Sequence, residues 1–153
     1  MMVGADFIGY PLKEVLKKEL ASNPKVSELL DFGVLSADDR NDYPNIGFGV
    51  AKAIAAGKAD RGLLVCGTGI GMAIAANKVH GIRATVAHDP YSLERAVVSN
   101  NCQIISLGAR VIAPEMALKL IGPWLDYEFD QVGSSSPKVK LLCDLELIEK
   151  EDK

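Results

Sequence analysis

The chain has 153 residues, the usual length of one domain, which can build a core without disulfide or metal support. Hydrophobic residues make up 48% of it and the formal net charge is −3, so the composition excludes a strongly basic protein that grips nucleic acid or an anionic membrane. No apolar run approaches the roughly 20 residues that span a bilayer, and no signal-peptide pattern is present, so we expect a cytoplasmic location.

Apolar runs alternate with amphipathic stretches along the first 125 residues. The runs that predict strands occupy residues 1–4, 30–34, 62–65, 82–86 and 104–107. The stretches with helical spacing occupy residues 12–20, 46–56, 70–79, 91–98 and 113–125. Five strands, each followed by a helix, predict a doubly wound α/β fold in which helices cover both faces of a parallel sheet. The first strand is the weakest of these predictions, because its apolar run is short.

The composition of the sequence changes after Trp124. A loop rich in glycine and serine leads to residues 138–149, where apolar residues recur at helical spacing. We predict a single domain over 1–153, with its core in 1–129 and a loop and carboxyl-terminal helix in 130–153. That helix is expected at a subunit interface, or else folded back on its own core.

The most informative segment, 63–72, reads Leu-Leu-Val-Cys-Gly-Thr-Gly-Ile-Gly-Met. It predicts a buried strand, a glycine-rich turn and a helix, and the backbone N–H groups of Gly67, Gly69 and Gly71 make such a turn a potential anion site. The turn is not a dinucleotide fingerprint, because Met72 stands where GxGxxG requires glycine, and it is not a P-loop, because no Gly-Lys-Ser/Thr follows.

Cys66 ends the strand that leads into this turn, and a thiol there can act as a nucleophile or a base. Thr68 can then donate a hydrogen bond to an oxygen that gains negative charge. The alternative is that Cys66 is a small buried hydrophobe beside a tight turn. Cys102 and Cys143 have no such turn and no CxxC spacing, so we expect no disulfide, no metal site and no cofactor.

Four further residues are candidates for binding a substrate. Asp6 follows the first strand on the same rim as Cys66, although a loop or cap carboxylate is the alternative. Tyr43 can lay its ring against a substrate or serve only as a helix-entry residue. Arg110 and Lys138 can reach a phosphate, whereas solvent-exposed side chains are the simpler interpretation. The two histidines are too few to form a metal cluster by themselves.

Several motifs resemble, in order and spacing, the ribose-5-phosphate isomerase B and galactose-6-phosphate isomerase family. They include Asp-Tyr-Pro at 42–44, Cys-Gly-Thr-Gly-Ile-Gly at 66–71, Ala-Ala-Asn-Lys at 75–78 and Leu-Gly-Ala-Arg-Val-Ile at 107–112. The resemblance covers the chain to about residue 129. It implies a five-stranded Rossmann-like fold with α/β/α layers, a homodimer or dimer of dimers with shared active sites, and metal-free aldose–ketose isomerisation of a sugar phosphate.

The resemblance also implies roles for single residues. Cys66 is expected to move a proton between adjacent carbons through a cis-enediol(ate), while Thr68 and the N–H groups of the turn stabilise the oxygens. Tyr43 and Asn100 map to substrate contacts, with Asn100 supplied by the neighbouring subunit. Arg110 maps to phosphate binding.

The departures from the family pattern bear on the substrate. Phe7 stands where the family has a histidine that helps to bind substrate, and Ser99 aligns with a histidine that assists ring opening. The arginines that clamp phosphate near the carboxyl terminus have no clear counterparts in 133–138, where Lys138 is the candidate cation. The chain therefore keeps the proton-transfer motif and lacks much of the family's ring-opening and phosphate-binding equipment.

A four-carbon sugar with phosphate on oxygen 4 cannot close a furanose ring through that oxygen, so it needs no ring-opening group. Residues 92–105 also resemble the family branch associated with erythritol breakdown. The sequence thus favours D-erythrulose 4-phosphate and D-erythrose 4-phosphate as substrates. The alternatives are a pentose- or hexose-phosphate isomerase that opens rings with His88 or water, a non-catalytic sugar-phosphate-binding protein, and a thiol redox protein.

Overall fold

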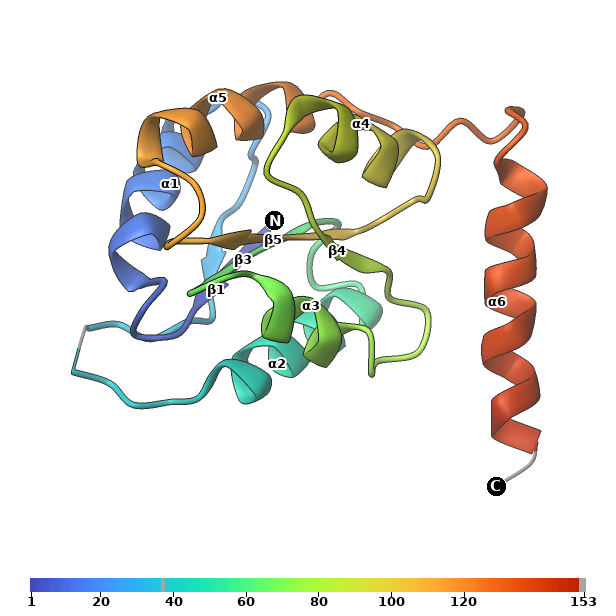
Figure 1. Cartoon of the computed structure of the whole chain (residues 1–153), viewed down its shortest axis with the longest axis horizontal. Helices are drawn as coiled ribbons and strands as arrows, with labels where there is room; N and C mark the ends of the chain where they lie inside the picture. The colour runs from blue at the N-terminus through green and yellow to red at the C-terminus, as the bar shows by residue number, and fades with distance from the viewer. Residues whose placement is uncertain (37, 152–153) are drawn as a thin grey trace.

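Five parallel strands and six helices make up the computed structural model, which describes residues 1–36 and 38–151. The strands are β1 (Met2–Ala5), β2 (Leu30–Asp31), β3 (Gly62–Cys66), β4 (Ala84–Val86) and β5 (Ile104–Gly108). The helices are α1 (Tyr10–Ser22), α2 (Tyr43–Ala55), α3 (Ile70–Ala76), α4 (Pro90–Val98), α5 (Pro114–Trp124) and α6 (Ser136–Glu151). The strand order is β2-β1-β3-β5-β4, with α1, α4 and α5 on one face and α2 and α3 on the other (Figure 1). The predicted three-layer α/β/α fold is confirmed.

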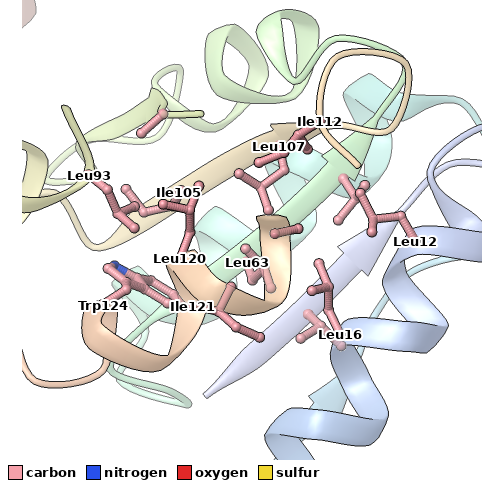
Figure 2. Packing of buried hydrophobic residues seen from close by; sticks show 14 of the residues in the cluster. Leu12, Leu16, Leu63, Leu93, Ile105, Leu107, Ile112, Leu120, Ile121 and Trp124 are labelled. Carbon is pink, nitrogen blue, oxygen red and sulfur yellow. The ribbon is translucent and has the colours of Figure 1, made fainter. Parts of the chain in front are cut away.

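Side chains of the central strand β3 alternate between two hydrophobic clusters, one on each face of the sheet. Leu63 and Val65 belong to the cluster under α1, α4 and α5, and Figure 2 shows Leu63 near Leu120 and Ile121 of α5. Leu64 and Cys66 belong to the cluster under α2 and α3. This alternation follows from the two-residue period of a strand, and it sends the Cys66 side chain toward α2 and α3.

The first strand is confirmed within one residue of its prediction, and the second is shorter than predicted. The short run at the start forms a fully buried strand, β1, which pairs with β2 on one side and with β3 on the other. β2 has two residues where the sequence predicted 30–34. The chain bends there because Gly33 passes close to β1, and a Cβ at Gly33 would lie 2.3 Å from Ala5 N. The Val34 N–H still donates to Ala5 O at 2.9 Å, so the segment keeps following β1.

Two helices begin earlier than their apolar spacing predicted. α1 and α2 each carry proline in the first turn, at Pro11 and Pro44, where its missing N–H costs nothing. Tyr43 is consequently the first residue of α2, not a residue before the helix. α3 ends at Ala76, short of the predicted 79, and the Asn77 side chain that follows it exchanges two hydrogen bonds with the backbone of Ala84.

Helix α6 belongs to neither of the two helical layers that cover the sheet and lies beyond its β4 edge (Figure 1). Its Glu146 accepts a hydrogen bond from Gly81 N–H at 3.2 Å, and Arg83 approaches the Cys143 Sγ at 3.8 Å. Four of its leucines are about half exposed: Leu141, Leu142, Leu145 and Leu147. The predicted tail segment 130–153 ends in residues 152 and 153, which lie outside the described part. Among the described residues, no helix is both long enough and apolar enough to cross a membrane.

Candidate active site

The order of the strands reverses beside β1, and such a reversal predicts a ligand-binding crevice at the carboxyl ends of β1 and β3. β2 lies on one side of β1, and β3, the next strand in the chain, lies on the other. In open α/β sheets, ligands bind outside the carboxyl ends of the strands at such a reversal. Asp6 follows β1 and Cys66 ends β3. The fold therefore brings these two predicted site residues to the same crevice.

Cys66 is 5% exposed, and its Sγ accepts a hydrogen bond from Gly69 N–H at 3.1 Å. The turn can bend back to the sulfur because Gly69 has φ +82°, a conformation that costs glycine little. Ser106 on β5 fixes the same residue, since its hydroxyl donates to Gly69 O at 2.7 Å. The turn thus holds a backbone donor on the sulfur, where it stabilises negative charge.

The loop after β5 supports the other side of the turn. The Arg110 N–H donates to Gly67 O at 3.0 Å, and the Arg110 Cδ lies 3.9 Å from the position of a Cβ on Gly67. Gly108 touches the Thr68 backbone so closely that a Cβ on Gly108 would lie 2.7 Å from Thr68 Cα. Thr68 itself is exposed at the tip of the turn, and Arg110 is exposed beside it. Both side chains can therefore face a ligand in the crevice.

Tyr43 packs its ring on Gly71, at the start of α3. A Cβ on Gly71 would lie 2.4 Å from Tyr43 Cε2, so glycine is needed for this approach. Tyr43 remains 43% exposed and lines an apolar hollow of about 460 Å³ together with Phe48, Ile74 and other residues of α2 and α3. The ring therefore forms a wall between the glycine-rich turn and this hollow.

Asp6 is 4% exposed, and its Oδ1 accepts a hydrogen bond from Gly9 N–H at 2.8 Å. The loop 6–9 lies directly on the end of β3, because a Cβ on Gly9 would lie 2.2 Å from Val65 O. The carboxylate therefore performs the loop-capping role that the sequence left open. It does so next to the end of β3, which Cys66 terminates.

Ser99, Asn100 and Lys138 are not brought to Cys66 of their own chain. Helix α4 returns from the carboxyl edge of the sheet, so Ser99 and Asn100 lie near its amino edge, where the Asn100 side chain donates to Arg95 O at 2.9 Å. Lys138 is exposed at the start of α6, after a loop that is hydrogen-bonded to the end of α4. A substrate role for these three residues requires a second copy of the chain.

His88 makes a contact that the sequence did not reveal. It accepts a hydrogen bond from Gly108 N–H on Nε2 at 2.8 Å, so the neutral imidazole carries its proton on Nδ1. Burial lowers the pKa of His88, and the nearby Asp89 only partly opposes this effect. Nε2 therefore holds the end of β5, and only Nδ1 of this histidine remains for the ring-opening role that the sequence considered.

Comparisons with known proteins agree with the resemblance that the motifs carry. Residues 1–142 match the family model described as Ribose/Galactose Isomerase. The chain is 47% identical over 143 residues to D-erythrulose-4-phosphate isomerase 2 of Mycolicibacterium smegmatis, covering 94% of each protein. It is 45% identical over 144 residues to ribose-5-P isomerase B of Listeria innocua, covering 94% of this chain and 95% of the relative. Its fold matches that of Clostridium thermocellum ribose-5-phosphate isomerase B with a TM-score of 0.89 and 38% identity, over 99% of this chain and 98% of the other.

Proposed function

The chain belongs to the ribose/galactose isomerase family and is a sugar-phosphate isomerase, and from this premise we propose that it interconverts D-erythrulose 4-phosphate and D-erythrose 4-phosphate. One observation carries the proposal. The thiol of Cys66 and its Gly69 N–H partner stand at the end of β3, whereas, by the resemblance of the motifs, Phe7 and Ser99 stand at the positions of the two family histidines. This combination suits a substrate that needs proton transfer but no ring opening.

In the proposed mechanism Cys66, as thiolate, removes a proton from the carbon beside the carbonyl and returns it to the former carbonyl carbon, while the hydroxyl proton passes from the other oxygen to the former carbonyl oxygen. Negative charge develops on the two oxygens of the cis-enediol(ate). Thr68 and the N–H groups of Gly67 and Gly71 are the donors that would stabilise it, because they line the same turn. The N–H of Gly69, to which the resemblance gave the same role, instead donates to the Cys66 sulfur. Asp6 would hold a sugar hydroxyl at the end of β1.

The tetrose preference has support from outside the site as well. The Mycolicibacterium smegmatis relative is named a D-erythrulose-4-phosphate isomerase. The Listeria innocua relative, named a ribose-5-P isomerase B, has nearly the same identity, so ribose 5-phosphate is the second candidate substrate.

We also propose a homodimer, or a dimer of dimers, in which a second copy supplies Ser99, Asn100 and Lys138 to the crevice. The half-exposed leucines of α6 support this arrangement, since an apolar side of a helix is stabilised when another surface covers it. The predicted interface role of segment 130–153 then concerns α6.

The test compares initial rates with D-erythrulose 4-phosphate and D-ribose 5-phosphate for the same preparation. We expect faster turnover of the tetrose, and a loss of about 10²- to 10⁴-fold in Cys66→Ala, as for removal of a general base. Cys143→Ala is the matched control, because this thiol lies on α6, and it should keep wild-type rates.

A clear preference for ribose 5-phosphate would overturn the tetrose assignment and leave the isomerase assignment intact. A wild-type protein that turns over neither sugar, but binds both as well as Cys66→Ala does, would point to the non-catalytic binding protein.

A further inference from the structure

Arg40 lies over the ring of Phe7, with its guanidinium carbon 4.7 Å from the ring centroid. Phe7 belongs to the loop after β1, and Arg40 belongs to the loop that leads into α2, three residues before Tyr43. The pair therefore joins the loop after β1 to the loop before α2. Neither residue has a part in the proton transfer described above.

The loop of Phe7 rests on the glycine-rich turn. Ile8, the next residue, has its Cγ2 3.7 Å from the position of a Cβ on Gly67, and the Cδ of Arg110 lies 3.9 Å from the same point. Gly67 is thus flanked by the loop that carries Phe7 and by Arg110. Arg40 stacks on the residue next to Ile8, so the loop that contacts Gly67 also carries the ring on which this second guanidinium lies.

The charge of Arg40 is not used by a carboxylate. Within the described residues, no ion pair of up to 4.0 Å includes its guanidinium. Stacking on an aromatic face fixes the plane of a guanidinium while its edge N–H groups remain available as donors. Such an edge matches the oxygens of a phosphate, to which arginine can donate two parallel hydrogen bonds.

We propose that Arg40, positioned by Phe7, binds the phosphate of the substrate together with Arg110. The inference rests on the proposed function for the identity of the substrate, and it adds how the site holds a phosphate without the family's carboxyl-terminal arginines. Phe7 then acts as a positioning residue. Its ring, which stands where the family has a histidine, holds the guanidinium of Arg40 in place for phosphate binding.

Binding of inorganic phosphate, measured by titration calorimetry at neutral pH, tests the proposal without turnover. Arg40→Ala should weaken phosphate binding at least about tenfold, since a hydrogen bond to a charged group is lost. Arg40→Lys should keep part of the affinity as a point charge. Lys58→Ala removes an exposed cation from the loop before β3 and should change the affinity less than about twofold. Unchanged phosphate affinity in Arg40→Ala overturns the proposal.

The role of Phe7 is tested by combining variants. Phe7→Leu should weaken phosphate binding when Arg40 is present and have no further effect in Arg40→Ala, because the ring acts through the guanidinium. Equal losses in both backgrounds contradict the positioning role. In kinetics with D-erythrulose 4-phosphate, Arg40→Ala should raise KM with little change in kcat. If phosphate binding falls in Arg40→Ala while wild type fails to turn over the tetrose, the substrate assignment fails and the phosphate site stands.

Discussion

The carboxyl edge of the sheet and the β4 side of the molecule both carry predicted site residues, but they hold them differently. At the carboxyl edge, Asp6 and Cys66 are buried, and each accepts a hydrogen bond from a backbone N–H three residues ahead. On the β4 side, Asn100 and Lys138 are exposed, and the neighbouring α6 leaves its leucines half exposed. The site residues at the carboxyl edge are buried by their own chain, whereas those on the β4 side are exposed to solvent.

This difference indicates which steps of the proposed reaction depend on the proposed dimer. Parallel strands bring their carboxyl ends to one edge whatever surrounds the molecule, so the position of Cys66 follows from the sheet itself. Asn100, after the end of α4, and Lys138, on α6, are exposed, so what they contact depends on which surface lies against them. We infer that proton transfer depends on one chain and that substrate contact depends on two.

Mixing two inactive variants is the most direct test of whether Cys66 and Asn100 of one site come from different chains. In a mixed dimer of Cys66→Ala and Asn100→Ala, one of the two sites has both residues if Asn100 acts across the interface. Random mixing makes about half of the dimers mixed, so about a quarter of wild-type activity should return. Initial rates after co-refolding, with native mass spectrometry to count mixed dimers, give the measurement.

A second mixture is the matched control for this experiment. Cys66 and Thr68 lie on the same turn of one chain, so Cys66→Ala mixed with Thr68→Ala should show no recovery. Recovery in the control, or its absence in the first mixture despite confirmed mixed dimers, would contradict the division between the two regions.

A buried ion pair between α1 and β2 supports the region that holds Asp6 and Cys66, and removing it should lower the stability of that region. Lys13 on α1 is 1% exposed, and its Nζ donates to both carboxylate oxygens of Asp31 and to Val34 O, each at 2.8 Å. Asp31→Asn removes one of the two carboxylates that pair with a buried ammonium, and because Glu14 remains 3.2 Å from Lys13 Nζ, the loss of unfolding free energy should lie below the about 3–5 kcal/mol expected for a fully unpaired buried charge. Asp144→Asn, which breaks the exposed pair with Lys140, is the control and should cause no measurable change.

The pH dependence of the same variant gives a second check. Burial raises the pKa of Asp31, but hydrogen bonds from Lys13 and Lys17 lower it more, so the net pKa lies below its ordinary value of 3.8. A lowered carboxyl pKa contributes stability that is complete above that ordinary value and is lost as the pH falls through the folded-state pKa. Urea unfolding should show the deficit of Asp31→Asn at neutral pH and a smaller one in acid. A deficit that is independent of pH would exclude the ion pair as its cause.

The sequence predicted the layers and the Cys66 turn because both are local. The alternation of apolar runs determines strand and helix, and three glycines in 67–71 determine a turn at the end of a buried strand. The boundaries failed where another segment decides them. β2 ends early because Gly33 meets β1, a contact between residues that lie far apart in the sequence.

Part of the site could not be predicted for the same reason. Ser106 gave a signal, since it is the lone hydroxyl in an apolar strand, but its partner Gly69 lies 37 residues away. The stacking of Arg40 on Phe7 has no signal in either local sequence. Bonds between side chains and distant backbone groups depend on the assembled sheet, so they become visible only in three dimensions.

The smallest expected effect concerns the fine position of the turn. Ser106→Ala removes the hydroxyl that donates to Gly69 O, and one buried hydrogen bond contributes about 1 kcal/mol. Because Gly69 N–H is the donor to the Cys66 sulfur, a loosened turn should lower kcat about fivefold, with KM little changed. Thr85→Ala is the control, since the Thr85 hydroxyl also contacts a backbone carbonyl but lies on β4, away from the turn. Equal kcat for both variants would show that Ser106 supports the fold without positioning the turn, and that the sheet alone suffices to hold Gly69 on the thiol.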